Sequence, residues 1–242
     1  MAQEKNNFFT VIIPTHDKRG KLLARAIRSV LNQTYPHFEL LIIDDHSTDD
    51  IEQIVKSFKD ERIRYIKLEG QGNRYFAQNA GMRAATQDYI CLLDSDDEYL
   101  SIYLECFNDA INENPEYKVF NCGTLVQHNK KEGEKTYYKY STIRNTFKPK
   151  EEGEGHIHFG SGSIGQGQFV FHRSVLDAVG YLPEARTWWD AAEMSGIPGY
   201  GREKPKRCLG NPWGNDFYLI YKITRKFKMK SFDLILYVQH CR

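Results

Sequence analysis

Residues 8–14 read FFTVIIP and residues 38–45 read FELLIIDD. Each is a short run of apolar and β-branched residues, a pattern that predicts a strand buried on both faces. Between them, residues 21–34 (KLLARAIRSVLNQT) repeat apolar side chains at helical spacing, which predicts an amphipathic helix. Because a strand, a helix and a second buried strand follow one another, we expect a β-α-β unit with parallel strands.

The same alternation continues through the first half of the chain. Further strands are expected at residues 62–68 and 89–93, and further helices at about 48–59, 74–86 and 99–112. This order predicts an α/β fold with a Rossmann-like, mostly parallel central sheet and helices on both faces.

The second half of the chain follows a less regular pattern. We expect two strands within residues 118–140, a long loop over 143–167, a strand at 168–172, helices at 174–179 and 215–226, and a strand at 231–238. Since no linker or repeat interrupts the 242 residues, we expect a single domain over 1–242. This domain would have two halves: residues 1–115 with the parallel strands, and residues 116–242 with the irregular part.

Charge and cysteine usage exclude several classes of protein. The 33 Lys and Arg residues nearly balance the 32 Asp and Glu residues, which argues against a nucleic-acid-binding protein. Five widely spaced cysteines indicate neither a disulfide framework nor a zinc site, so we expect free thiols and a cytoplasmic location. The absence of a long apolar run argues against a membrane span. Basic residues in the last third favour a solvated face, with peripheral association at an anionic membrane as the alternative.

Residues 94–97 (DSDD) directly follow the strand expected at 89–93. Three carboxylates this close repel one another, and a divalent cation is the simplest way to relieve the repulsion. Mg²⁺ and Mn²⁺ prefer carboxylate oxygens, and phosphates commonly complete their coordination. The alternative is a solvated acidic loop that caps the next helix.

A second acidic pair, Asp44 and Asp45, ends the strand at 38–43. Ligands bind beyond the carboxyl ends of strands in parallel sheets, so we expect Thr15, Asp45 and Asp94 or Asp96 to meet in one crevice. A carboxylate there could accept a hydrogen bond from a base or a ribose hydroxyl. The alternative is that the pair only begins a turn and caps a helix.

Taken together, these segments resemble a known enzyme family. Residues 8–50, from FFTVIIPTHD through SVLNQTY to IIDDHSTDD, are similar to the opening of a family 2 glycosyltransferase of the GT-A fold. Residues 79–85 (NAGMRAA) and 89–97 (YICLLDSDD) resemble later segments of the family, whose DxD metal signature is matched by Asp94-Ser95-Asp96. The resemblance covers about the first hundred residues and implies a metal-dependent, inverting transferase.

The resemblance also implies a donor, an acceptor and a cofactor. The donor would be a nucleotide-diphosphate sugar, with a UDP-sugar favoured, and the cofactor would be Mn²⁺ or Mg²⁺. The acceptor would be a hydroxyl of a saccharide or lipid-linked glycan at the inner face of the cell membrane. The donor-site residues implied are Pro14, Thr15, Asp45, Asn73, Gln78, Asp94 and Asp96. Within this set, Asp45, Asn73 and Gln78 would contact the base, Asp94 would face the ribose, and Asp96 would ligate the metal.

Two residues of the second half complete the implied site. Asp216 stands where the family begins a helix with its catalytic base, and a helix N-terminal carboxylate is the alternative. His240 stands where some members complete the metal shell with a histidine, giving the ligand set Asp94, Asp96 and His240; an incidental histidine is the alternative.

The chain departs from the family pattern at a few positions, which keeps other functions open. His46 replaces a common glycine, Gln78 a common arginine, and Asn215 an acidic residue. A degenerate domain that binds a nucleotide sugar without turnover is one alternative. A Mg²⁺-dependent phosphoacceptor signalling domain is another, although the chain is about twice the length of such a domain. The oligomeric state is not indicated by the sequence.

Overall fold

The computed structural model describes residues 5–17, 19–69, 74–132, 135–143, 166–182 and 215–241. Its strands are β1 (Phe9–Thr15), β2 (Phe38–Asp44), β3 (Ile63–Lys67), β4 (Tyr89–Leu92), β5 (Glu98–Tyr99), β6 (Val119–Glu132), β7 (Lys135–Ile143), β8 (Phe169–His172) and β9 (Met229–Cys241). Its helices are α1 (Gly20–Leu31), α2 (Ile51–Lys56), α3 (Arg74–Ala84), α4 (Tyr103–Glu113), α5 (Ser174–Val179) and α7 (Asn215–Lys226), with a 3₁₀ turn at Gln166–Gln168.

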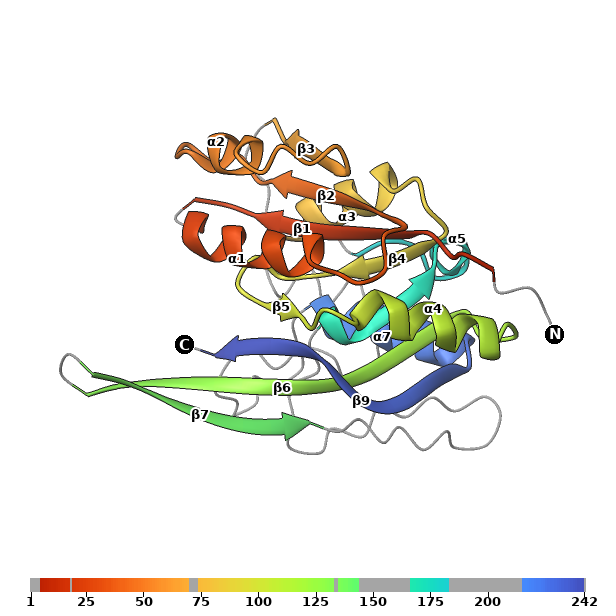
Figure 1. Cartoon of the computed structure of the whole chain (residues 1–242). Helices are drawn as coiled ribbons and strands as arrows, with labels where there is room; N and C mark the ends of the chain where they lie inside the picture. Colours follow the sequence, from red (N-terminus) through yellow and green to blue (C-terminus); the bar gives the residue numbers. More distant parts are fainter. Residues whose placement is uncertain are drawn as a thin grey trace, which may run out of the picture.

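The described strands form one mixed sheet in the order β3-β2-β1-β4-β8-β6-β9-β5, with β7 paired to β6 (Figure 1). Strands β1 to β4 are parallel to their neighbours in this group, which confirms the Rossmann-like half. Strand β8 joins β4 to β6 by antiparallel pairing on both sides. Strands from both halves of the chain therefore share one sheet.

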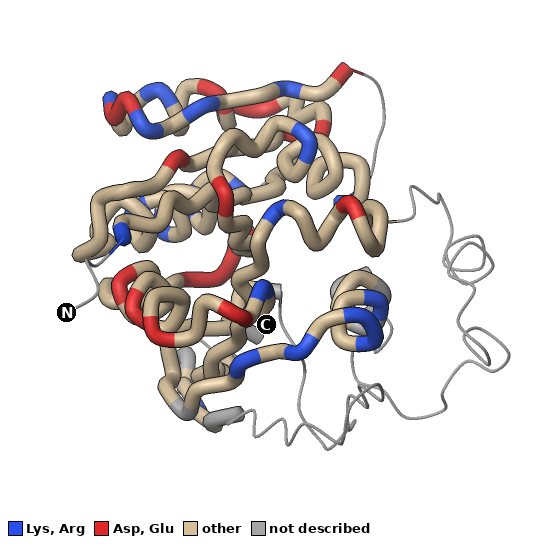
Figure 2. Tube along the Cα trace, turned by 90° about the vertical axis from the view of Figure 1, so that its right-hand side faces the viewer, with Lys and Arg blue, Asp and Glu red and all other residues tan. Residues whose placement is uncertain are grey.

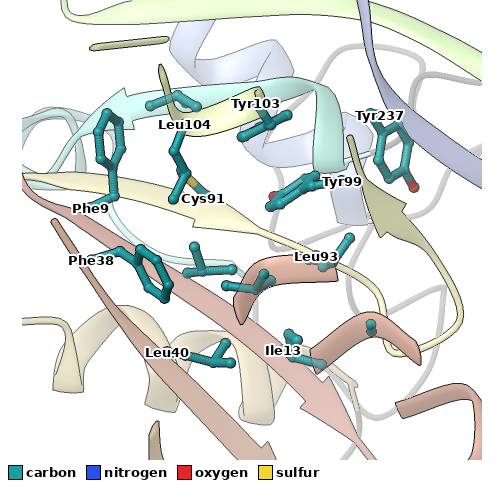
Figure 3. Close-up of a cluster of buried hydrophobic side chains, with 14 of the residues drawn as sticks. Phe9, Ile13, Phe38, Leu40, Cys91, Leu93, Tyr99, Tyr103, Leu104 and Tyr237 are labelled. Atoms are coloured by element: carbon teal, nitrogen blue, oxygen red, sulfur yellow. The ribbon is translucent and has the colours of Figure 1, made fainter. Parts of the chain in front are cut away.

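Helices cover both faces of the sheet because the side chains of β1 alternate between them. Phe9, Val11 and Ile13 pack with residues of α1, α2 and α4 in one apolar cluster. Figure 3 shows part of this cluster, with Phe9 and Ile13 of β1 and Leu104 of α4 labelled. Ile12 points the other way and packs with residues of α3, α5 and α7. Burial on both faces is the arrangement that the continuous apolar run of β1 predicts.

The helix expected at residues 99–112 begins later than predicted. Glu98 and Tyr99 form strand β5, which pairs antiparallel with β9, and α4 starts at Tyr103. The main-chain N–H of Leu100 donates to the carbonyl of Leu236 at 2.9 Å. Hydrogen bonding to a strand from the far end of the chain thus overrides the helical spacing of these residues. The pairing also holds the end of β9 beside the acidic loop.

Glu39 is a buried carboxylate within the sheet. It accepts hydrogen bonds at 2.7 Å from the Thr10 hydroxyl and the Thr86 main-chain N–H, and Arg64 lies 2.9 Å away. Burial by itself would raise the pKa of Glu39, but these donors together lower it below its ordinary value of 4.5. The charged form of Glu39 is therefore part of the folded structure.

We expect Glu39→Gln to lower the free energy of unfolding by roughly 2 kcal/mol at neutral pH, since an amide NH₂ would meet the Arg64 guanidinium. Because the folded pKa is depressed, this stabilisation is present above the unfolded pKa and is lost as the pH falls through the folded pKa. In urea titrations at falling pH, the difference in the free energy of unfolding between wild type and variant should therefore become smaller. Exposed Glu116, changed to Gln, is the control; a gap that stays constant through acidification would contradict the assignment.

Candidate functional site

A cavity of about 260 Å³ lies where β1, β2 and β4 reach their carboxyl ends, next to the last residues of β9. The residues that line it include Pro14, Thr15, Asp45, Asp94, Asp96, Asp97 and His240. Residues from three parallel strand ends and from the end of the chain thus meet at one place. This is the crevice that the strand-end rule predicts.

Some of the predicted donor-site residues are not part of this wall. Gln78 is fully buried, and from α3 it is Arg74 and Ala77 that line the cavity. Asn73 lies outside the described residues. Asp216 stands in the first turn of α7, and its side chain is outside the described part of the structure.

The acidic pair at the end of β2 divides into a structural and a cavity residue. Asp44 is fully buried, and its Oδ1 accepts the main-chain N–H of Ser47 at 3.0 Å. The Thr48 N–H donates to the Asp17 carboxylate at 2.6 Å. Helix α2 begins at Ile51, later than the expected start at about residue 48. Asp44 therefore builds the turn, and the turn presents Asp45 to the cavity.

The residues after β4 form a tight turn that collects three carboxylates. The Asp97 N–H donates to the Asp94 carbonyl at 3.0 Å. As a result, carboxylate oxygens of Asp94, Asp96 and Asp97 lie within 4.8 Å of one another. Such a group needs compensating positive charge or a shared proton.

Two arginines compensate part of this charge. Arg19, which precedes α1, donates to Asp96 Oδ2 at 2.6 Å, and Arg74 of α3 donates to both Asp94 oxygens at 2.8 and 2.9 Å. Both arginines line the same cavity. Neither arginine can be recognised from the local sequence, because each meets the acidic turn only through the folding of the chain.

Asp97 is the most deeply buried of the three acids, with 3% of its surface exposed. Burial first, and then the neighbouring Asp94 and Asp96 carboxylates, raise the pKa of Asp97 to about 8. Hydrogen bonds from the Tyr237 hydroxyl and from the His240 N–H at 2.9 Å oppose this rise. Asp97 is therefore a carboxyl group whose charged form is costly unless a cation is near.

His240 comes to the cavity from the end of β9 with only 8% of its side chain exposed. Its Nε2 lies 2.7 Å from Glu98 Oε1, and its buried Nδ1 has no hydrogen-bond partner among the described residues. Burial, reinforced by the charge of Arg25, lowers the pKa of His240 and favours the neutral imidazole. The three clustered carboxylates and the imidazole of His240 line one cavity, and such a donor set fits Mn²⁺ or Mg²⁺.

Comparison with known proteins identifies the family. The model of glycosyl transferase family 2 matches residues 10–180. This match covers more than half of the chain, and the chain therefore belongs to glycosyl transferase family 2.

Curated relatives match parts of the chain. The chain is 42% identical over 106 residues to an uncharacterized glycosyltransferase of Rickettsia felis, covering 43% of this chain and 17% of the relative. It is 34% identical over 120 residues to the GalNAc(5)-diNAcBac-PP-undecaprenol beta-1,3-glucosyltransferase of Campylobacter jejuni, covering 47% of this chain and 37% of the relative. The matched segments thus span well under half the length of these relatives.

Solved structures share the fold along nearly the whole chain. S. aureus TarS 1-349 in complex with UDP-GlcNAc has a TM-score of 0.65 at 17% identity and covers 97% of this chain and 59% of its own. The mannosyltransferase PcManGT of Pyrobaculum calidifontis, in complex with GDP-Man and Mn²⁺, has a TM-score of 0.60 at 12% identity and covers 97% and 57%. The expected GT-A fold is confirmed. No helix in the described ranges has the length and apolar character to cross a bilayer.

We expect Arg19→Ala to bind Mn²⁺ alone more tightly than wild type, by about fivefold, because Asp96 Oδ2 loses its guanidinium partner. Isothermal titration with MnCl₂ in the absence of nucleotide measures the difference. Arg28→Ala removes an exposed charge from α1, the helix that Arg19 precedes, and should leave the affinity unchanged. Equal or weaker Mn²⁺ binding by Arg19→Ala would contradict a cation site at Asp96.

Proposed function

We propose that this chain transfers a sugar, with inversion, from a UDP-sugar to a hydroxyl of a saccharide or lipid-linked acceptor, with a divalent cation as cofactor. The observation that carries this proposal is the meeting of Thr15, Asp45, Asp94, Asp96 and His240 in one cavity at the carboxyl edge of the sheet. Membership of a glycosyltransferase family supports the type of reaction.

The nucleoside would lie against the ends of β1 and β2. Pro14 and Thr15 line the cavity there with Asp45, and the buried Thr15 Oγ1 has no hydrogen-bond partner among the described residues. Asp45 would accept a hydrogen bond from the base, Asn73 would be a further base contact, and Asp94 would face the ribose. Gln78, which is fully buried and does not line the cavity, has no role in this proposal. Similarity to TarS, which was solved with UDP-GlcNAc, supports uracil as the base of the donor. PcManGT was solved with GDP-Man, so GDP-sugars should be tested beside UDP-sugars as donors.

Asp94, Asp96 and His240 would hold the cation. A bound Mn²⁺ or Mg²⁺ would act as a Lewis acid that stabilises the charge on the departing diphosphate. The imidazole nitrogen in this set favours Mn²⁺ over Mg²⁺. Arg19 and Arg74 lie on the same wall, and their guanidinium groups would bind the phosphate oxygens of the donor.

Asp216, in the first turn of α7, would be the catalytic base. Its carboxylate would take the proton of the acceptor hydroxyl while the acceptor oxygen attacks C1 of the sugar. The bond between C1 and the diphosphate oxygen breaks, UDP leaves, and the configuration at C1 inverts.

The acceptor would stand at the cytoplasmic face of a membrane. The relative from Campylobacter jejuni carries an undecaprenol-linked acceptor in its name, which supports a lipid-linked substrate. Basic residues gather on α7, at the start of β9 and between the two elements (Figure 2). Arg225, Lys226 and Lys228 among them are exposed. This surface would meet anionic headgroups or the phosphates of such an acceptor.

We expect Asp96→Asn to lose Mn²⁺-dependent binding of UDP and to lower UDP release from a UDP-sugar by at least about 100-fold. The measurements are a thermal-shift panel of UDP, GDP and their sugars with and without Mn²⁺, and a UDP-release assay. Asp109→Asn, an exposed change on α4, is the control. Wild-type protein that is stabilised by UDP but releases none from any donor would instead favour a degenerate binding domain.

We expect Asp216→Asn to bind UDP with Mn²⁺ as wild type does and to lose turnover by about 100-fold or more, because only proton removal is affected. Asp177→Asn changes an exposed carboxylate in the first turn of α5 and controls for a helix N-terminal effect. Turnover near the wild-type rate in Asp216→Asn would exclude this residue as the base.

A further inference from the structure

Strand β5 brings the carboxylate of Glu98 to the carboxyl end of β9. Glu98 is paired with Val238 in the antiparallel register of β5 and β9. Residues opposite each other in such a pair share a face, and so do residues two apart in one strand, so Glu98 lies on the same face as His240. The observed distance of 2.7 Å between Glu98 Oε1 and His240 Nε2 follows from this register.

The contact with Glu98 decides which nitrogen of His240 carries the proton. A carboxylate only accepts hydrogen bonds, so the neutral imidazole must hold its hydrogen on Nε2 to make this contact. The lone pair then belongs to Nδ1, the buried atom that has no hydrogen-bond partner among the described residues. His240 lines the cavity that also contains Asp94 and Asp96.

We propose that Glu98 is a positioning residue that holds His240 in its Nε2-protonated form, so that Nδ1 is available as a ligand at the metal site. This inference rests on the proposed function, because it assigns Glu98 a role at the cation site of that function. Carboxylates that hold metal-binding histidines in this way typically raise the affinity for the metal by 10- to 100-fold.

Arg25 ties this pair to the acidic turn. Its Nε lies 3.2 Å from Glu98 Oε1, and its Nη2 donates to the main-chain carbonyl of Asp96. One arginine thus holds both the carboxylate that orients the imidazole and the peptide that carries Asp96. An exposed ion pair alone would contribute little to stability, whereas this one links the turn that carries Asp96 to the carboxylate that contacts His240.

The experiment compares wild type with Glu98→Ala and Glu98→Gln in two measurements without nucleotide. Long-range ¹H–¹⁵N NMR of metal-free protein, at a pH where His240 is neutral, reports which nitrogen is protonated, and calorimetry reports the Mn²⁺ affinity. We expect Nε2–H in wild type. In Glu98→Ala we expect loss of this single form and a 10- to 100-fold weaker Mn²⁺ affinity. Glu98→Gln should stay within a few fold of wild type, because the amide oxygen still accepts from Nε2–H.

Two further variants separate the role of Glu98 from general effects. Glu113→Ala, an exposed change at the end of α4, should alter neither measurement. Arg25→Ala should keep the Nε2–H form, since the contact between Glu98 and His240 remains. Loss of that form in Arg25→Ala to the same extent as in Glu98→Ala would overturn the direct role of Glu98.

A wild-type His240 protonated on Nδ1, or a Glu98→Ala variant with unchanged protonation and unchanged Mn²⁺ affinity, would also overturn the proposal. Failure of the proposed function gives a different result. If no donor sugar is transferred, the NMR signature and the Mn²⁺ affinity of the variants still decide whether Glu98 positions the imidazole.

Discussion

Repulsion between the carboxylates of the turn after β4 is the constraint on which the rest of the site depends. Asp94, Asp96 and Asp97 bring oxygens within 4.8 Å of one another at the end of a buried strand. Arg19 forms an ion pair with Asp96, and Arg74 forms one with Asp94. Burial and the neighbouring carboxylates raise the pKa of Asp97 to about 8. A cation at the turn would take over part of this compensation and leave the arginines for an anionic donor.

The mixed second half of the sheet gives this turn its remaining neighbours. Strand β9 lies next to β6 and is held by β5, so the end of the chain returns to the carboxyl edge of the parallel strands. Tyr237 and His240 therefore reach Asp97, and Glu98 reaches His240. A parallel sheet alone would supply the acids but not the imidazole.

Much of this arrangement could be predicted from local sequence. Apolar runs and helical spacing were sufficient for the β-α-β half, and the strand-end rule was sufficient to bring Asp45 and Asp96 to one cavity. What depends on distant pairing could not be predicted in this way. The local pattern predicts a helix at Tyr99, whereas pairing with Tyr237 makes this residue part of a strand. The burial of Gln78 likewise depends on how α3 packs against the sheet. The roles of Arg19, Arg74 and Glu98 likewise exist only through contacts made in the folded chain.

In the mechanism proposed above, the acidic turn and the end of β9 bind one divalent ion together with the diphosphate of the donor. The most direct measurement is anomalous diffraction at the manganese edge from crystals soaked with Mn²⁺ and UDP. We expect one strong peak within coordination distance of an Asp96 carboxylate oxygen and His240 Nδ1, beside the UDP phosphates. A manganese peak elsewhere with UDP bound, or UDP bound in this cavity without manganese, would contradict this mechanism.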